Sequence, residues 1–418
     1  MKLGNPPTPA SAINKGALAG ILLLVIFAML WGNYLFVKAN PGGNDFVPLY
    51  LGPRMYFLHG WSPYGEQTGQ AIQELIFGRA ATGAEDRHSY VYPLYASYLF
   101  LPFALIPEYS LARAAWMTLL EILTLGLTFV SLRQVKWRPA FWLMPILLVF
   151  SLLWYHGLRS IINGNAVVLT AFLLGAGLLS LQHERDKLAG IFLALATIKP
   201  NLVLIPLLFI TVWSISRKRW TLLAWMAASM LILALSGLVL IPDWPLQNLA
   251  AIARYPQYTS ELTLGETFET WWPLTGPLLH WGLIALLTIL LLFEWKAVWE
   301  KTETHFLWTI SLTLTISQWL DIPTNPGNFN LLFLPLMVVF AALSKRWGRR
   351  GELLTLTSLF LLFLGLWGLF LTTIEYTASQ PSQNPLMFIP LPLFLLIALY
   401  AVRAWVVSGY EQNINKTS

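Results

Sequence analysis

Cysteine is absent from the 418 residues, and charged residues make up only 11% of them. Without cysteine the chain can form no disulfide and no thiolate metal site. A soluble domain carries about 25% charged residues, so this chain cannot cover itself with a surface that faces water. Its six histidines are scattered without ligand spacing, and the acids Glu85 and Asp86 precede Arg87, which indicates local charge neutralisation. No Gly-x-x-x-x-Gly-Lys phosphate loop occurs, and the sequence predicts neither a metal site nor a cofactor.

Long apolar blocks take the place of the missing charge, since hydrophobic residues make up 56% of the chain. About 20 apolar residues cross the hydrocarbon as a helix, whereas the alternating segments of about 10 residues that a membrane β-barrel needs do not occur. We therefore predict an all-α, polytopic membrane protein with about 12 transmembrane helices, forming a single integral membrane domain over residues 1–418. The expected spans lie near residues 17–37, 110–132, 139–155, 166–181, 187–199, 201–215, 220–241, 276–295, 304–319, 329–343, 353–374 and 386–407.

The distribution of Lys and Arg sets the orientation of these spans, because cytoplasmic loops carry an excess of positive charge. Most of the 26 basic residues fall on one side if residues 90–107 do not cross the membrane. The prolines and tyrosines of that segment also suit an interfacial or re-entrant helix. This predicts a cytoplasmic N-terminus, a first outer loop at 38–108 and a second at 242–275. The net charge of +6 lies in loops between spans, so we expect membrane lipids and no nucleic acid as partners, in the plasma or inner membrane of the cell.

A turn at the outer end of the first span places one acidic residue at the membrane surface. Gly42 and Gly43 are followed by Asn44, Asp45 and Phe46. Asp45 or Asn44 is well placed to cap an interfacial helix through its first free N–H groups. A carboxylate held there can equally act as a general base. Spacing alone leaves both roles open.

Short motifs follow one another through residues 30–220. They are Asp45-Phe46-x-x-x-Tyr50, Leu58-His59-Gly60-x-x-Pro63-Tyr64, Tyr90-Val91-Tyr92-Pro93, Pro102-x-x-x-x-Pro107, the turn Asn163-Gly164-Asn165, and Leu188-Ala189-Gly190 through Ala194 to Lys199-Pro200. This series resembles glycosyltransferase family 87, of the C-type superfamily of multispanning transferases that use polyprenyl-phosphate sugars. Leu94 stands where members often have a second proline, and the turn lacks their Gln. The resemblance implies a C-type fold with interfacial or re-entrant helices in the first outer loop.

The resemblance also implies a hexosyltransferase that moves mannose or another hexose from a polyprenyl phosphate to a lipid-linked or outward-facing acceptor. Because the phosphate is already a good leaving group, the reaction needs one base for the acceptor hydroxyl and positive charge for the departing phosphate. Asp45 is expected to be the base. The transfer is expected to be a single displacement that inverts the anomeric carbon, at the non-cytoplasmic face. Lys199 is the first candidate for the phosphate, because a charge at membrane depth is a functional suspect; a lysine snorkelling to headgroups is the alternative.

Weaker candidates come from the same outer regions, and each has a structural or solvated alternative. For the donor phosphate they are Arg159 and Arg54, and for substrate binding they are His59, Tyr64, Tyr92, Asn163 and Asn165. Glu266 and Glu269 of the second outer loop either touch the acceptor or form a solvated face. Glu121, an acid deep within a predicted span, is expected to pair with a neighbouring helix.

Two other classes of protein stay open. A transporter or lipid flippase commonly has repeated halves and helices broken near the bilayer centre. Here no repeat is evident, and the Lys199-Pro200 break lies at a predicted helix end. A non-catalytic membrane partner would instead use its outer loops to hold an assembly.

Overall fold

The structure is a computed structural model that describes residues 15–83, 85–257, 263–299, 303–377 and 380–408. The α-helices in these ranges are α1 (Lys15–Ala39), α2 (Phe46–His59), α3 (Glu66–Phe77), α4 (Ser97–Ala104), α5 (Tyr109–Gln134), α6 (Leu143–Leu153), α7 (Tyr155–Asn163), α8 (Val167–Gln182), α9 (Asp186–Leu195), α10 (Pro200–Ser216), α11 (Trp220–Leu240), α12 (Trp244–Arg254), α13 (Leu264–Trp271), α14 (Gly276–Ala297), α15 (Glu303–Ser317), α16 (Phe333–Trp347), α17 (Arg349–Thr373) and α18 (Pro390–Ser408). Short 3₁₀ segments lie at Leu94–Ala96, Ala196–Ile198, Tyr255–Gln257, Pro326–Leu332 and Pro385–Phe388. Strands β1 (Glu375–Thr377) and β2 (Gln380–Ser382) pair antiparallel, so the described chain is helical apart from this small sheet.

Among the residues that the structure describes, seven helices are long and apolar enough to cross a membrane, and an eighth span results if α6 and α7, bent by 48°, cross together. The seven have 21 to 26 residues, which at about 1.5 Å per residue reaches the thickness of the hydrocarbon. Four further predicted spans correspond to α8, α9, α10 and α15, which have only 10 to 17 residues. A multi-pass, helical membrane protein is therefore confirmed, whereas the number of about 12 spans stays a prediction.

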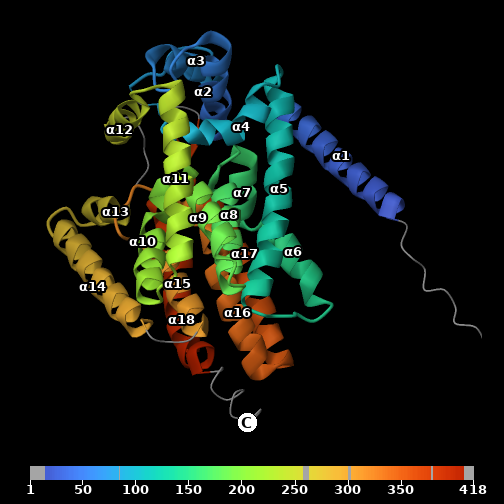
Figure 1. Cartoon of the computed structure of the whole chain (residues 1–418), viewed down its shortest axis with the longest axis vertical. Helices are drawn as coiled ribbons and strands as arrows, with labels where there is room; N and C mark the ends of the chain where they lie inside the picture. The colour runs from blue at the N-terminus through green and yellow to red at the C-terminus, as the bar shows by residue number, and fades with distance from the viewer. Residues whose placement is uncertain (1–14, 84, 258–262, 300–302, 378–379, 409–418) are drawn as a thin grey trace, which may run out of the picture.

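The spans differ widely in how far other helices enclose them. In the apolar span that contains α16, 94% of the residues are buried, against 6% in that of α1. Figure 1 shows α1 leaning away from the bundle on one side and α14 standing at the opposite edge. Asn33 of α1 donates a hydrogen bond of 3.0 Å from Nδ2 to Oε2 of Glu121 on α5, which confirms the predicted pairing of that acid. The large apolar side chains exposed on α1 and α14 suit contact with lipid.

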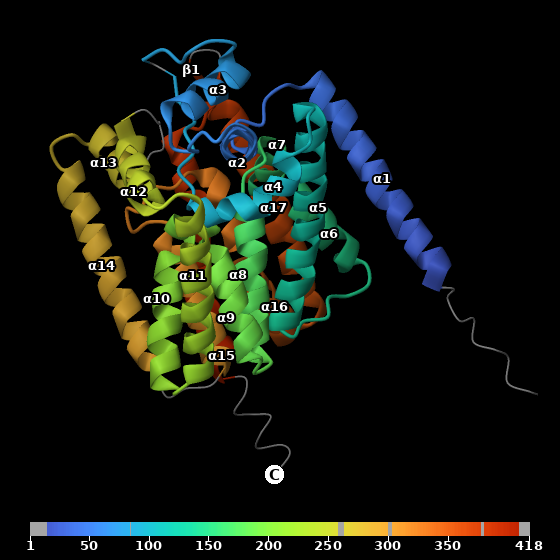
Figure 2. The same cartoon turned by 45° about the horizontal axis from the view of Figure 1, so that its top comes forward.

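The segment predicted as the first outer loop, called the outer loop below, places α2, α3 and α4 at one end of the bundle (Figures 1 and 2). The first half of α2 is buried, and the ring of Tyr90 lies where a Cβ on Gly52 would be. Tyr90 shares a hydrogen bond of 2.8 Å with Ser97 at the start of α4. Because α4 has eight residues, it is too short to cross the membrane. This agrees with the prediction that residues 90–107 do not cross the membrane.

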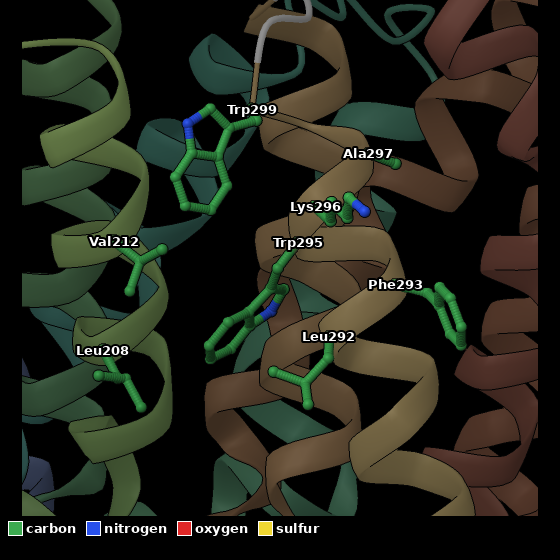
Figure 3. A pocket seen from close by; sticks show the side chains of 8 residues that line it. All are labelled: Leu208, Val212, Leu292, Phe293, Trp295, Lys296, Ala297 and Trp299. Carbon is green, nitrogen blue, oxygen red and sulfur yellow. The ribbon is translucent and has the colours of Figure 1, made fainter.

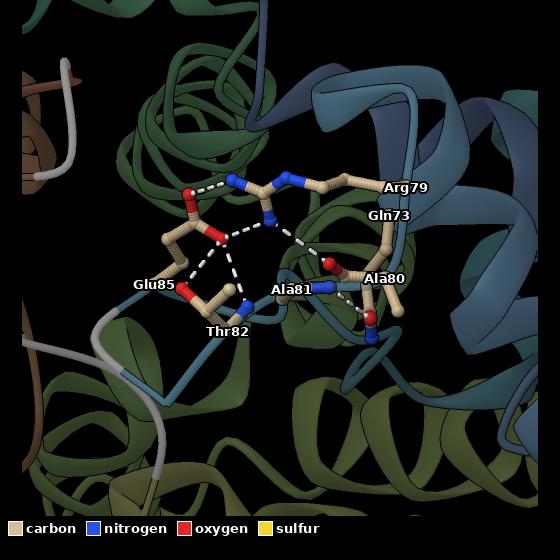
Figure 4. Close-up of polar contacts among 6 residues, drawn as sticks. All are labelled: Gln73, Arg79, Ala80, Ala81, Thr82 and Glu85. Carbon is tan, nitrogen blue, oxygen red and sulfur yellow. Dashed lines mark hydrogen bonds and ion pairs between the residues drawn. The ribbon is translucent and has the colours of Figure 1, made fainter.

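An ion pair closes the outer loop after α3 (Figure 4). Arg79 donates to both carboxylate oxygens of Glu85, at 2.7 and 2.8 Å, and the backbone N–H of Thr82 donates to the same carboxylate at 2.8 Å. The hydrogen bonds from Arg79 and Thr82 lower the pKa of Glu85 to about 2. Glu85 is thus neutralised locally, as predicted, although the partner is Arg79 from before the turn.

Candidate active site

Asp45 occupies the position just before α2, at the end of a glycine turn. Gly42 and Gly43 have φ angles of 133° and 81°, a region that L side chains rarely enter. The carbonyl of Gly43 accepts the first N–H groups of α2, from Phe46 at 2.8 Å and Val47 at 3.2 Å. The side chain of Asp45 makes no cap hydrogen bond. It is half-buried, and its Oδ2 accepts a hydrogen bond of 3.1 Å from Nδ2 of Asn165.

Asn165 reaches Asp45 because the chain turns sharply at Gly164. Gly164 has a φ of 71° and follows the last residue of α7. A Cβ at this position would lie 2.5 Å from Cβ of Phe46, so a glycine is required where the turn meets the start of α2. The carbonyl of Gly164 accepts a hydrogen bond of 2.8 Å from Trp116. Asn165 lies two residues before α8, and its Oδ1 accepts the N–H of Val167, the first residue of that helix, at 2.9 Å.

Lys199 lies at a break between two helical segments. A residue before proline is disfavoured in the α conformation, and Lys199 leaves it, with φ −127° and ψ 76°, before Pro200 opens α10. Its ammonium donates hydrogen bonds of 2.8 Å to Oδ1 of Asn165 and 2.7 Å to Oδ1 of Asn328. Both acceptors are neutral amide oxygens, so these two bonds hold the ammonium in place without cancelling its charge.

The amide of Asn165 therefore joins Asp45 and Lys199. One end of the amide donates to the carboxylate and the other accepts from the ammonium. With ordinary amide bond lengths, the two charged groups lie no more than about 8 Å apart. Asn328 completes the group, since its Oδ1 also lies 3.4 Å from Nδ2 of Asn165. We call Asp45, Asn165, Lys199 and Asn328 the Asp45 cluster.

The sequence analysis passed over Asn328, which lies in the 3₁₀ segment Pro326–Leu332 and is 2% exposed. Its Nδ2 donates to Oγ1 of Thr324 at 3.0 Å, so both ends of this buried amide are used. Contacts to α7 fix the same segment: Nδ1 of His156 is 2.6 Å from the carbonyl of Pro326, and Ser160 donates to the carbonyl of Gly327 at 2.8 Å. Sequence spacing offered no signal for it, because Asn328 is 129 residues from Lys199.

The amino-acid sequence matches the family model of glycosyltransferase family 87 over residues 90–320, which is more than half of the chain. The chain belongs to this family. No curated protein and no solved structure matches it. Family 87 membership indicates a membrane glycosyltransferase. The match includes Asn165 and Lys199, whereas Asp45 precedes it and Asn328 follows it; the hydrogen bonds of the tertiary structure bring these two next to the matched residues.

Arg113 of the family 87 match is a second residue that the sequence analysis missed. It is 1% exposed and donates to the carbonyls of Asn40 at 2.9 Å and Ile162 at 3.0 Å. Its side chain fills the space where a Cβ on Gly43 would be. Arg113 thus ties the turn before Asp45 to the end of α7. A lone arginine within a predicted membrane helix is the signal that would have found it.

The two arginines predicted to help Lys199 contact residues outside the Asp45 cluster. Arg54 donates to the carbonyl of Ala104 at 2.7 Å and stacks over Tyr50 at 5.4 Å, which fixes the end of α4. Arg159 lies 5.4 Å from the ring centre of Phe370. With the amide of Gln383 turned so that its oxygen faces it, Arg159 donates to that oxygen at 2.8 and 2.7 Å. The phosphate role of these two arginines stays a prediction.

Of the residues predicted to bind substrate, His59, Tyr64 and Tyr92 lie in the outer loop and Asn163 and Asn165 at the end of α7 and just after it. The hydroxyl of Tyr64 donates to the carbonyl of Tyr92 at 2.8 Å, and burial raises the pKa of Tyr64. His59 is exposed, with its ring centre 5.4 Å from that of Trp61. Asn163 ends α7, two residues before Asn165. Asn165 is thus the one residue of this group that belongs to the Asp45 cluster, and the roles of the others stay predictions.

A large apolar hollow lies away from this cluster, between α10 and α14 (Figure 3). Its volume is about 1050 Å³, and Leu208, Leu292 and Phe293 are among its lining residues. Lys296 and Trp299 lie at the end of α14 that is far from α13 and the outer loop (Figure 1). Such a lining, apolar apart from Lys296, suits a lipid chain.

Proposed function

We propose that this family 87 protein transfers a hexose, mannose in the first instance, from a polyprenyl-phosphate sugar to a lipid-linked or outward-facing acceptor. The observation that carries the proposal is the bridge of Asn165 between one carboxylate and one ammonium. The transfer needs these two groups, because the departing phosphate requires positive charge and the acceptor hydroxyl must lose a proton.

Asp45 acts as the general base in this mechanism. Its carboxylate is half-buried and is not engaged in capping α2. The hydrogen bond from Asn165 to Oδ2 orients the carboxylate for the proton of the acceptor hydroxyl. As this proton leaves, the hydroxyl oxygen attacks the anomeric carbon and the bond to the phosphate breaks. No general acid is needed, unlike in glycoside hydrolysis with its two carboxylates.

Lys199 binds the phosphate of the donor. Its charge is held at the start of α10 by two neutral oxygens, 2.8 and 2.7 Å away, so it is preorganised to stabilise the negative charge that develops on the leaving group. A single displacement inverts the anomeric carbon, because the acceptor attacks opposite the phosphate. The active site faces the non-cytoplasmic side, the side given by the positive-inside rule.

The test is the variant Asp45→Asn, assayed for transfer of radiolabelled hexose in membranes. General-base catalysis contributes about 10²–10⁴-fold, so transfer should fall by at least about 100-fold while the protein stays in the membrane. The control is Glu66→Gln, a second acid of the outer loop, exposed on α3, which should keep full activity. Unchanged turnover in Asp45→Asn would remove Asp45 from the mechanism, and a product with the donor's anomeric configuration would exclude the single displacement.

A further inference from the structure

A second hollow, of about 250 Å³, lies at the outer end of α14. It is formed by α13, the start of α14, and the chain on either side of them, and its lining includes Tyr255, Glu266, Glu269, His280, Trp281 and Asp321. We call it the His280 hollow. It is smaller than the roughly 300–1,000 Å³ of sites for drug-sized ligands. Its size therefore suits a small polar group such as one sugar ring.

Two buried polar groups in the His280 hollow have no hydrogen-bond partner among the described residues. His280 is 6% exposed, and neither of its ring nitrogens makes a hydrogen bond. Its Nε2 lies 3.3 Å from Oδ1 of Asp321, and its Nδ1 lies 4.0 Å from Glu269, but both contacts lack hydrogen-bond geometry. Oδ1 of Asp321 is likewise buried without a partner. Because leaving buried polar groups unpaired is costly, these groups point to a bound ligand that pairs with them.

The backbone holds these groups in place. Asp321 has a φ of 58°, a left-handed conformation that costs energy for a residue other than glycine. The ring of His280 fills the space where a Cβ on Gly265 would be, and it stacks on Trp281 with ring centres 5.1 Å apart. Glu266 is engaged locally, since its Oε2 accepts the N–H of Thr263 at 2.9 Å. The carboxylates of Glu269 and Asp321 are the acids left to face the ligand.

The charge of the lining selects the kind of ligand. Carboxylates repel a phosphate, so the hollow does not suit the phosphate of the donor. Carboxylate and imidazole groups accept hydrogen bonds from neighbouring hydroxyls, and an aromatic ring offers an apolar face with a polar edge. Together they suit a neutral, hydroxyl-rich ring, which is a sugar.

One short segment connects the His280 hollow to the Asp45 cluster. Pro323 lines the hollow, and its carbonyl accepts a hydrogen bond of 2.9 Å from Asn201, two residues after Lys199. Asn328 of the cluster follows five residues after Pro323. An extended chain of that length spans at most about 18 Å. The hollow and the cluster therefore lie within reach of a single acceptor molecule of a few sugar rings.

We propose that the His280 hollow is a subsite that binds a sugar unit of the acceptor, with its hydroxyls on Asp321, His280 and Glu269 and its ring against Trp281. The inference rests on the proposed function, because it assigns the acceptor side of the same reaction. It adds the second outer loop to the recognition of the acceptor. The sugar bound there positions the hydroxyl that Asp45 deprotonates.

The experiment measures sugar binding apart from catalysis. The full-length Asp45→Asn protein in lipid nanodiscs is mixed with methyl α-D-mannopyranoside or methyl β-D-glucopyranoside, and saturation-transfer NMR reports binding. We expect a signal for at least one of these sugars. Adding Trp281→Leu should weaken it about 5–10-fold, and adding Asp321→Asn about tenfold or more. The matched control is Trp272→Leu, an exposed tryptophan just after α13 outside the lining, which should leave the signal unchanged.

Kinetics of the single variants supply a second readout. In an otherwise intact chain, Trp281→Leu should raise the KM for the acceptor while leaving the KM for the donor and kcat unchanged. Three results would overturn the proposal: absence of sugar binding, equal binding in all variants, or displacement of the sugar by added Ca²⁺. If Asp321→Asn fails to fold, Trp281→Leu still tests the proposal. Sugar binding with full transfer in Asp45→Asn would instead refute the proposed mechanism and leave the subsite standing.

Discussion

Replacing Asn165 by the isosteric Leu tests whether the amide bridge organises the two charged groups. Asn165 accepts from Lys199 and donates to Asp45. A hydrogen bond to a charged group contributes about 1.5–3 kcal/mol, and each 1.36 kcal/mol lost in the transition state slows the reaction about tenfold. We expect Asn165→Leu to reduce transfer about 100-fold, and Lys199→Gln to do so by a similar factor.

The double variant decides between independent and joint action. If Asn165 works by holding Lys199, then Asn165→Leu should reduce transfer less in the Lys199→Gln background, which has no ammonium to hold, than in the wild type. Contacting residues show interaction energies of about 0.5–3 kcal/mol. The double variant should therefore lose between about 60-fold and about 4,000-fold, short of the roughly 10⁴-fold that independent effects would give.

A companion variant separates folding from chemistry. Asn165 is buried and its Oδ1 also accepts the N–H of Val167 at the start of α8. Losing a hydrogen bond of this kind costs about 1 kcal/mol, so Asn165→Leu lowers stability as well as activity. Asn165→Asp keeps the acceptor for Val167 and Lys199 but cannot donate to Asp45, and it sets a second carboxylate beside that of Asp45, so it should lose activity although the hydrogen bond to Val167 is kept.

The assay is transfer of radiolabelled hexose in membranes, normalised to the amount of protein by immunoblot, with thermal unfolding of the purified variants alongside. Gln70→Ala, an exposed amide on α3, serves as the control and should keep full activity. Full additivity of Asn165→Leu and Lys199→Gln would refute the bridge. So would normal activity in Asn165→Asp.

Two further predictions concern the outer loop and the glycine turn. The low pKa of Glu85, about 2, means that its ion pair with Arg79 stabilises the loop above the unfolded pKa of about 4.3 and is lost as the pH falls toward 2. Limited proteolysis after residue 78 should accelerate over that window in the wild type, whereas Glu85→Gln should be cleaved fast already at neutral pH; equal rates would contradict the assignment. Gly43→Ala combines a left-handed φ with a collision against Arg113 and should lower stability by about 2 kcal/mol or more. The control Gly42→Ala has open space around its Cβ, so only the conformational cost should lower its stability. An equal loss of unfolding free energy in the two variants would show that the Arg113 side chain moves aside without cost.

The short-range features of the site could be predicted because they depend on local chemistry. Two glycines before Asp45 require a turn, and Pro200 forces Lys199 out of a helix, wherever the chain lies. The role of Asp45 was left open, because a helix cap and a free carboxylate look alike in sequence. The structure shows no cap bond from its side chain, since the carbonyl of Gly43 serves the first N–H groups of α2.

Residues that join the site from far away in the sequence were missed for a physical reason. Asn328 meets Lys199 across 129 residues, and Arg113 meets Asn40 across 73, and no periodicity encodes such contacts. The same holds for Arg54, which the sequence suggested for phosphate binding and which donates to the carbonyl of Ala104. A cation in an apolar stretch signals that it has a partner, but only packing decides which partner it finds.

The sequence by itself determined that the chain is a helical membrane protein, because a chain with few charges and long apolar blocks must satisfy its backbone hydrogen bonds inside lipid. It also determined the local bends that hold Asp45 and Lys199. The tertiary structure alone decided that one amide of Asn165 joins these two side chains, and that His280 and Asp321 lie side by side in the lining of one hollow. Such meetings depend on how helices far apart in the chain pack together, and local sequence does not encode that packing.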